Sequence, residues 1–286
     1  SSIIKVDTIQ DQAGNNIINE SSDTITIGAS GDTVNVVGTL QNNGSAVEVD
    51  SVTFKEGGTN FTNSLLVGTS STGTLDAAQN NTGVGLGVFA ALTSGDGNTA
   101  VGTNSLDANT TGANNVAVGF NSMGSNTTGS DNTSTGVESL VSATTGASNA
   151  AFGRQAMCKT TTGASNTAAG AFALCANTTG ACNVAVGKDS LKENTTANNN
   201  TAVGLCALTV NTTGAENTSV GRKSLVANTT GVCNVAVGVN ALFSNTTGAN
   251  NVAFGVSALE TNSTADNNTA VGFEALKDNT TGTVNT

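Results

Sequence analysis

The side chains best suited to chemistry in this sequence are five cysteines, and no histidine accompanies them. Without histidine and without a C-x-x-C pair, the chain lacks the most common general base and the most common zinc-binding spacings. Cys158 and Cys175 are 17 residues apart, which is the length of the repeat described below. A disulfide or a metal contact between these two is one interpretation. We expect instead that they, like Cys182, Cys206 and Cys233, are free thiols that pack as small, weakly apolar residues.

The other candidate sites have structural explanations that involve no chemistry. Glu48 and Asp50 would lie on one face of a predicted strand, but no second element supplies a complementary acid or base, so solvated carboxylates are favoured. The many N-T-T triplets match the acceptor pattern for N-glycosylation, and their regular spacing indicates turns. Neither the calcium-solenoid phrase G-G-x-G-x-D nor a phosphate-binding loop occurs. We therefore predict no enzyme activity and no catalytic, cofactor-binding or metal-binding residue.

A 17-residue repeat organises most of the chain. Twelve units begin at Asn81 and at every seventeenth residue thereafter to Asn268, without insertion or deletion. Their consensus is N-[TV]-[AS]-V-G-x-x-[SA]-L-x-x-N-T-T-G-x-x, and positions 1 to 17 below refer to it. Position 5 is always glycine and position 9 is usually leucine. The residues predicted to shape the coils are Gly102, Gly119, Gly136, Gly153, Gly170, Gly187, Gly204, Gly221, Gly238, Gly255, Gly272, Leu106, Leu140, Leu174, Leu191, Leu208, Leu225, Leu242, Leu259 and Leu276.

A fixed period of this length predicts an all-β fold, a parallel β-solenoid or β-roll of twelve stacked coils over residues 81–286. Helical repeats are about twice as long, and threonine, valine and asparagine are poor helix formers. The phrases NTAV and NVAV are typical of strands, the glycine at position 5 of a bend, and NTTG of a corner. Each unit should therefore read strand, bend, short strand and loop.

Alternation along the strand assigns positions 4 and 9 to the interior and the small residues at positions 3, 5 and 8 to a second surface. We predict that this second surface contacts other copies of the chain; exposure to solvent is the alternative. One valine and one leucine per coil bury too little apolar surface to offset the ordering of 17 residues. A homotrimer would share the missing burial, and ladders of asparagine at positions 1 and 12 would add hydrogen bonds along the stack.

Residues 1–80 lack the repeat and alternate apolar with polar residues, a pattern that predicts a short β-rich attachment or stalk module. Strand patterns occur at 23–31, 32–40, 51–58 and 63–70. This segment has nine acids and two bases, a net charge of −7, and residues 81–286 have eleven acids and seven bases, a net charge of −4. The total of −11 disfavours nucleic acid and anionic lipid as partners. No secretory signal and no membrane-spanning stretch are visible, which fits synthesis in a host cytoplasm and release by lysis, or a mature secreted protein.

The phrases NNTAVGLCAL (199–208) and NNTAVGFEAL (267–276) resemble the head repeat of trimeric autotransporter adhesins of the YadA type. That resemblance implies a left-handed β-roll assembled as a homotrimer. The chain departs from the adhesins in its longer unit and its NTTG loop. In these two features, and in its opening segment, it is similar to tail-fibre-like virion proteins of marine bacteriophages. This second resemblance implies a virion location, with other virion proteins at the N-terminal end and a tip protein at the C-terminal end.

Three functions follow as expectations. The favoured one is a structural shaft in a bacteriophage appendage such as a tail fibre, which supports host attachment. The second is an adhesin-type protein that itself binds a host or surface ligand, although the chain has no tryptophan or tyrosine on which a sugar would stack. The third is an ice-binding solenoid that uses the row of threonines at position 14. Ice-binding solenoids present T-x-T on a strand, whereas these paired threonines are adjacent and lie in a loop, so we favour it least.

Overall fold

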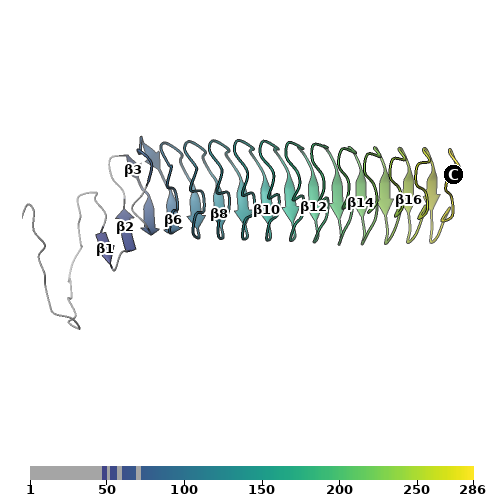
Figure 1. The fold of residues 1–286 in the computed structure, drawn as a ribbon, viewed down its shortest axis with the longest axis horizontal. Coiled ribbons are helices and arrows are strands. Elements are labelled where there is room, and N and C mark those ends of the chain that lie inside the picture. Colours follow the sequence, from purple (N-terminus) through teal and green to yellow (C-terminus); the bar gives the residue numbers. More distant parts are fainter. Residues whose placement is uncertain (1–46, 50–51, 57–59, 69–71) are drawn as a thin grey trace, which may run out of the picture. The chain divides into compact units, whose positions relative to one another are not determined.

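A computed structural model describes residues 47–49, 52–56, 60–68 and 72–286, and every regular element in these ranges is a strand (Figure 1). The strands predicted at 23–31 and 32–40 and the pairing of Glu48 with Asp50 lie outside the described residues. All of these described residues belong to one compact unit.

The strands of the first part are short, and their order prepares the stack that follows. They are β1 (Val47–Val49), β2 (Val52–Glu56), β3 (Phe61–Thr62), β4 (Leu65–Gly68), β5 (Ala78–Gln79) and β6 (Thr82–Gly85). Each later coil contributes one strand of three residues. These are β7 (Thr99–Val101), β8 (Val116–Val118), β9 (Thr133–Thr135), β10 (Ala150–Phe152), β11 (Thr167–Ala169), β12 (Val184–Val186), β13 (Thr201–Val203), β14 (Thr218–Val220), β15 (Val235–Val237), β16 (Val252–Phe254) and β17 (Thr269–Val271).

One parallel sheet runs the length of the stack, in the order β4-β6-β7 and onward to β17. Every pairing in it joins residues 17 apart, as in Thr99 with Val116 and Val116 with Thr133. The predicted parallel β-solenoid with a 17-residue period is therefore confirmed. The prediction of a second strand in each coil is wrong. In the coils that contain β7–β17, turns and irregular segments occupy the rest of the unit.

The regular stack begins before Asn81, the first residue that matches the repeat. Strand β4 pairs in parallel with β6 at the 17-residue spacing, and β3 pairs likewise with β5. Ser64 takes the place of the asparagine at position 1, since its hydroxyl oxygen accepts the backbone N–H of Asn81 at 2.8 Å. The hairpin of β1 and β2 then covers the outer edge of β4 by antiparallel pairing.

The interior of the coils differs from the prediction at positions 3 and 4. Alanine or serine at position 3, as in Ala185, is buried, whereas Val186 at position 4 is exposed. Position 8 is also buried in every coil but the last. Of the small residues predicted as a contact between copies, those at positions 3 and 8 are therefore inside each chain, and only the glycine at position 5 is partly exposed. The coil is thin, and the leucine at position 9 fills its interior from the wall opposite the sheet. Only a small side chain at position 3 fits against that leucine.

The glycine at position 5 brings successive coils into backbone contact. Gly204 has a φ of 136°, and a Cβ on it would lie 2.6 Å from the backbone oxygen of Gly221 in the next coil. Both the left-handed backbone conformation and the lack of room for a Cβ next to the following coil favour glycine. Gly272, in the last coil, has the same conformation with a φ of 130°, but a Cβ there would meet nothing closer than 3.9 Å.

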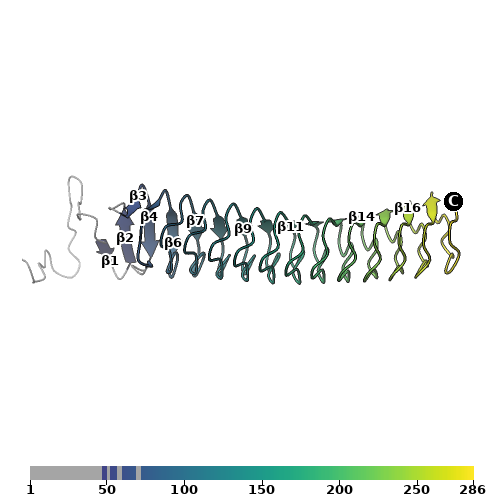
Figure 2. The same ribbon diagram turned by 90° about the horizontal axis from the view of Figure 1, so that it is seen from above.

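The strands turn gradually about the axis of the stack. Figure 2 shows them face-on near β4, edge-on near β11 and face-on again near β17. A twist of this kind is normal for paired strands. Any surface that follows one repeat position therefore winds slowly around the solenoid.

Candidate functional surface

An uninterrupted ladder of buried asparagines follows position 1. In one rung, the Asn115 side-chain amide donates to Asn98 Oδ1 at 3.1 Å and to the Gly129 backbone oxygen at 2.8 Å. Its own Oδ1 accepts the backbone N–H and the side-chain amide of Asn132. Every polar atom of the side chain is thereby satisfied, which is what a buried amide requires. The predicted ladder at position 1 is confirmed.

A second asparagine ladder follows position 12 and is broken in the middle. From Asn177 to Asn279, each amide donates to the preceding asparagine, as Asn211 does to Asn194 Oδ1 at 3.0 Å. Ala143 and Thr160 replace asparagine in two coils. Asn126 Oδ1 and Thr160 Oγ1 are consequently buried without a hydrogen-bond partner.

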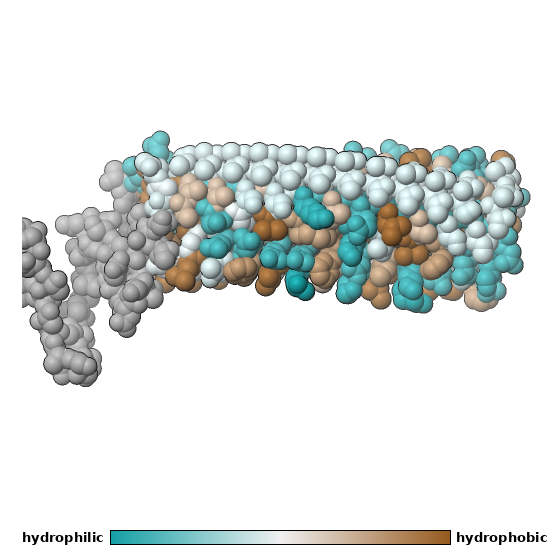
Figure 3. Space-filling view, viewed as in Figure 1, coloured by the Kyte–Doolittle hydropathy of each residue, from teal (hydrophilic) through white to brown (hydrophobic). Residues whose placement is uncertain are grey.

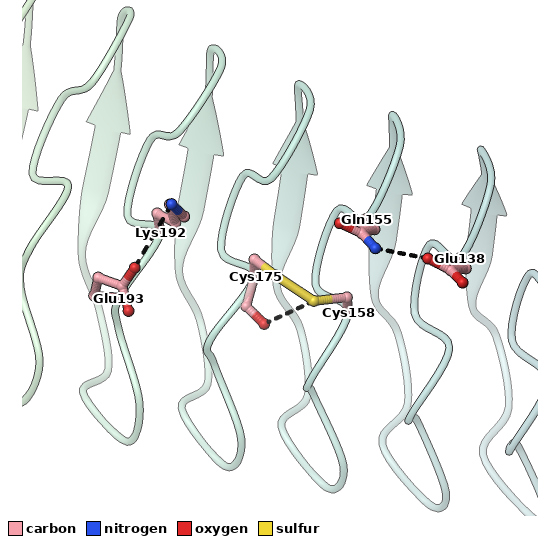
Figure 4. The surroundings of a disulfide bond; sticks show 6 residues. All are labelled: Glu138, Gln155, Cys158, Cys175, Lys192 and Glu193. Atoms are coloured by element: carbon pink, nitrogen blue, oxygen red, sulfur yellow. Dashed lines mark hydrogen bonds and ion pairs between the residues drawn. A yellow bond between two sulfur atoms is a disulfide. The ribbon is translucent and has the colours of Figure 1, made fainter.

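A disulfide joins Cys158 to Cys175 on neighbouring coils, whose Cα atoms are 4.9 Å apart (Figure 4). The expectation of free thiols at these two positions is therefore wrong, although the repeat correctly placed them side by side. The disulfide links the same pair of coils as Thr160 and Asn177, where the second asparagine ladder has no rung. It supplies a covalent link at that point.

The other three cysteines are free, as expected. Cys182 is exposed, and Cys206 and Cys233 are partly buried. The Glu216 carboxylate lies 3.4 Å from the Cys233 sulfur, and its hydrogen bond with the thiol raises the pKa of Cys233. A raised pKa lowers the reactive thiolate fraction, so this thiol is not an activated nucleophile.

The leucines predicted to shape the coils lie inside them. All are fully buried except Leu276 of the last coil, which is 37% exposed. They also adopt a left-handed backbone conformation, with φ of 50° at Leu106 and 52° at Leu208. Nothing in the sequence signals this conformation, because bulky residues rarely adopt it.

The solvent-facing side of the parallel sheet forms an uncharged surface along the whole solenoid. We call positions 2 and 4 of β6–β17 the sheet stripe; it holds threonine, valine, alanine and phenylalanine alone. Position 4 is well exposed in places, by 38% at Val101 and 56% at Phe254. An exposed face of a sheet normally carries polar side chains. A long apolar stripe on this face is therefore a candidate contact surface.

A second uncharged surface follows position 14. We call this row the threonine ridge; it runs from Ser94 to Thr281 and is threonine in every coil but the first. All twelve side chains are exposed, and none of their hydroxyls forms a hydrogen bond within the described chain. Figure 3 shows a continuous band of intermediate hydropathy along one edge of the solenoid, as a row of threonine and glycine would give.

Hydrogen bonds fix the backbone of the threonine ridge from each coil to the next. The Thr127 backbone oxygen accepts the N–H groups of Thr110, Thr111 and Gly112 at 2.9, 3.2 and 3.3 Å, and also the Thr110 hydroxyl at 2.9 Å. The adjacent threonine at position 13 thus uses its hydroxyl internally. Of the two adjacent threonine rows in this corner, only the row at position 14 keeps free hydroxyls, whereas an ice-binding surface of the T-x-T kind would present two parallel rows.

Charged side chains occupy the remaining surface. Every Asp, Glu, Lys and Arg of residues 81–286 lies at position 6, 7, 10, 11, 16 or 17. They include the ion pair of Lys277 with Glu274 at 2.7 Å and the stacking of Arg154 on Phe172, 5.4 Å from the ring centre. The charged positions thus separate the sheet stripe from the threonine ridge on both sides of the coil.

Within the described ranges there is no group of three or more Cys, Asp or Glu side chains that would hold a metal ion. The same ranges contain no helix that would cross a membrane.

The fold and these surfaces define a β-solenoid repeat protein. No family model matches the chain, and no curated protein and no solved structure is significantly similar to it.

Proposed function

We propose that the chain is a structural shaft of a bacteriophage virion appendage, such as a tail fibre, and that it works as a homotrimer. The observation that carries the proposal is the unbroken register, in which every parallel pairing from β4 to β17 spans 17 residues. A stack without insertions leaves no loop to form a binding pocket or hinge, and suits a mechanical spacer. The virion location rests on the resemblance of the repeat and of the opening segment to phage fibre proteins.

The interior explains how such a shaft is stiff. One unbroken asparagine ladder and one row of backbone contacts at glycine tie each coil to the next, in addition to the sheet, and the second asparagine ladder joins most of the coils. Bending the rod would break several of these links at once. Buried amides also have strong geometric preferences, so neighbouring coils have one way to fit together.

The exterior supports association. In a solitary rod, the sheet stripe would leave valine and phenylalanine in water along its full length. Burying that stripe between copies gives the apolar surface that a thin coil cannot bury alone. Other virion proteins would bind at the N-terminal end and a tip protein at the C-terminal end, so the host contact would belong to the particle as a whole.

Two measurements test the proposal. Light scattering of the purified chain should give three times the monomer mass, and immunogold labelling should place the chain on fibres of phage particles. A stable folded monomer would contradict the homotrimer. Labelling of bacterial cell surfaces in the absence of phage would favour the adhesin-type function instead.

A further inference from the structure

We infer that the threonine ridge of one copy packs against the sheet stripe of the next copy, in register, around the axis of the trimer. The inference rests on the proposed homotrimer and specifies its contact. Two separate uncharged surfaces, on different sides of the same coil, are the observation from which it starts.

Cyclic symmetry explains why there are two surfaces. In a ring of three copies, each chain contacts both neighbours, and the contact is heterologous, so one surface of a chain meets a different surface of the next. A single self-complementary surface would instead produce a dimer with twofold symmetry. Apart from the half-buried positions 5 and 13 that adjoin them in sequence, the sheet stripe and the threonine ridge are the only rows at the surface of the repeat region that are free of charge in all twelve coils.

Comparison among the coils shows that the ridge is under a constraint the solenoid itself does not impose. Exposed position 6 varies among Leu, Thr, Phe, Val, Ala, Arg and Lys, and position 10 varies as widely. Position 14 is equally exposed, yet it bears a hydroxyl in every coil. Those hydroxyls have no partner in the described chain, whereas the neighbouring position 13 is explained by its internal hydrogen bonds. A partner outside the chain accounts for position 14.

A second copy of the chain is the partner that matches the ridge in length and spacing. Both surfaces repeat once per coil, about 4.8 Å apart, so contacts made in one coil recur in all twelve. Because both follow the same twist (Figure 2), copies that wind around one another keep them in contact. A strip about 58 Å long and about 10 Å wide gives roughly 1,200 Å² of total buried surface per contact, at the lower end of stable interfaces.

The side chains on the two surfaces are chemically compatible. The threonine methyl group at position 14 packs on the valine or phenylalanine that ten coils have at position 4, and its hydroxyl has the hydroxyl of the threonine that seven coils have at position 2 within the same stripe. No charge has to leave water, so the contact avoids the cost of desolvating a charge. The charged positions remain at the rim, where they keep the assembled fibre soluble.

Pairs of introduced cysteines test the contact. In a background with Cys182, Cys206 and Cys233 changed to serine, we would combine Thr179→Cys on the ridge with Ala169→Cys on the sheet stripe of the same coil. A short bismaleimide should then link chains up to a covalent trimer and no further. The register control pairs Thr179→Cys with Val237→Cys, four coils or about 19 Å away, and should not cross-link.

Each outcome separates the contact from the proposed shaft. Linked dimers from Ala169→Cys alone would show that two sheet stripes meet, which overturns the inference but leaves the trimer to be judged by mass. A trimeric mass without cross-linking of the matched pair would also overturn the contact only. A monomeric mass would overturn the trimer as well, and linked species beyond the trimer would exclude a closed ring.

A charge on the ridge gives a second measurement that needs no cross-linking. The change Thr196→Glu with Thr213→Glu should raise the concentration at which the trimer dissociates by at least about tenfold, because the contact would bury unpaired carboxylates. The matched control is Val210→Glu, an exposed residue at position 11 of the same coil as Thr213. Equal dissociation of both variants would contradict the inference.

Discussion

Completing the second asparagine ladder should stabilise the solenoid. The change is Ala143→Asn with Thr160→Asn, which fills the two gaps between Asn126 and Asn177. The other coils show that position 12 accommodates asparagine, with rungs of 2.8–3.0 Å such as Asn126 to Asn109 and Asn211 to Asn194. Asn126 Oδ1, buried without a partner, would gain a donor, and the unpaired Thr160 hydroxyl would be removed.

The expected gain follows from the bonds that would form. Three rungs would be completed: one from the first introduced amide to Asn126, one between the two introduced side chains, and one from Asn177 to the second. Each introduced amide would also donate to the position 15 glycine of its own coil, as Asn177 does at 3.0 Å. Five bonds at about 1 kcal/mol each, less about 1 kcal/mol for ordering each introduced side chain, give about 3 kcal/mol.

Thermal unfolding followed by circular dichroism measures the effect. A gain of about 3 kcal/mol corresponds to an increase in Tm of about 6–12 °C for a chain of this length. The matched control is Ala156→Asn, a fully buried alanine at position 8 with no ladder to join; it should be destabilised. If the double variant melts at or below the wild-type Tm with an unchanged spectrum, the ladder does not stabilise the fold as argued.

Three further results are expected. Gly204→Ala should destabilise by well over 1 kcal/mol, and Gly272→Ala by only about 1 kcal/mol, because they share the left-handed conformation but only Gly204 faces the next coil; equal losses in urea unfolding would deny the close packing. Burial raises the pKa of Asp107 above its unfolded value, so folding is favoured while the carboxyl is protonated, and this contribution is lost as the pH rises through the folded pKa. Asp107→Asn should therefore be the more stable form at pH 7, with the difference closing below about pH 4; a pH-independent difference would contradict this. The purified chain should show no more thermal hysteresis than a control protein, since only one of the two adjacent threonine rows in the corner has free hydroxyls.

The period of the sequence was enough to predict the stack, because a repeat without insertions places residue i over residue i + 17. It also placed Cys158 beside Cys175 and the asparagines of position 1 in one row. The prediction of which strand residues point into the coil was wrong for a physical reason. Positions 3 and 4 are both apolar in most coils, and a strand of three residues offers too little alternation to tell its two faces apart.

Other features had weaker signals. The left-handed backbone conformation of the leucine at position 9 could not be predicted from the sequence, because only the way in which the coil closes on itself requires it. The coil that precedes Asn81 does have a signal in the sequence. The phrase S-L-L-V-G at residues 64–68 has the spacing and the glycine of N-T-A-V-G. Serine in place of asparagine hid it, although a hydroxyl oxygen accepts the same backbone N–H.

The repeats serve as their own comparison, and the structure divides what is constant among them into two kinds. Asparagine at position 1 and glycine at position 5 are constant because each coil needs them to contact the next. A hydroxyl at position 14, from threonine in eleven coils and serine in the first, is constant where no contact within the described chain requires it, while the surface positions 10 and 11 carry charges of both signs. A ridge facing only water would be free to change in the same way. Its constancy across twelve coils therefore points to a periodic surface outside the chain, and another copy of the solenoid has that period.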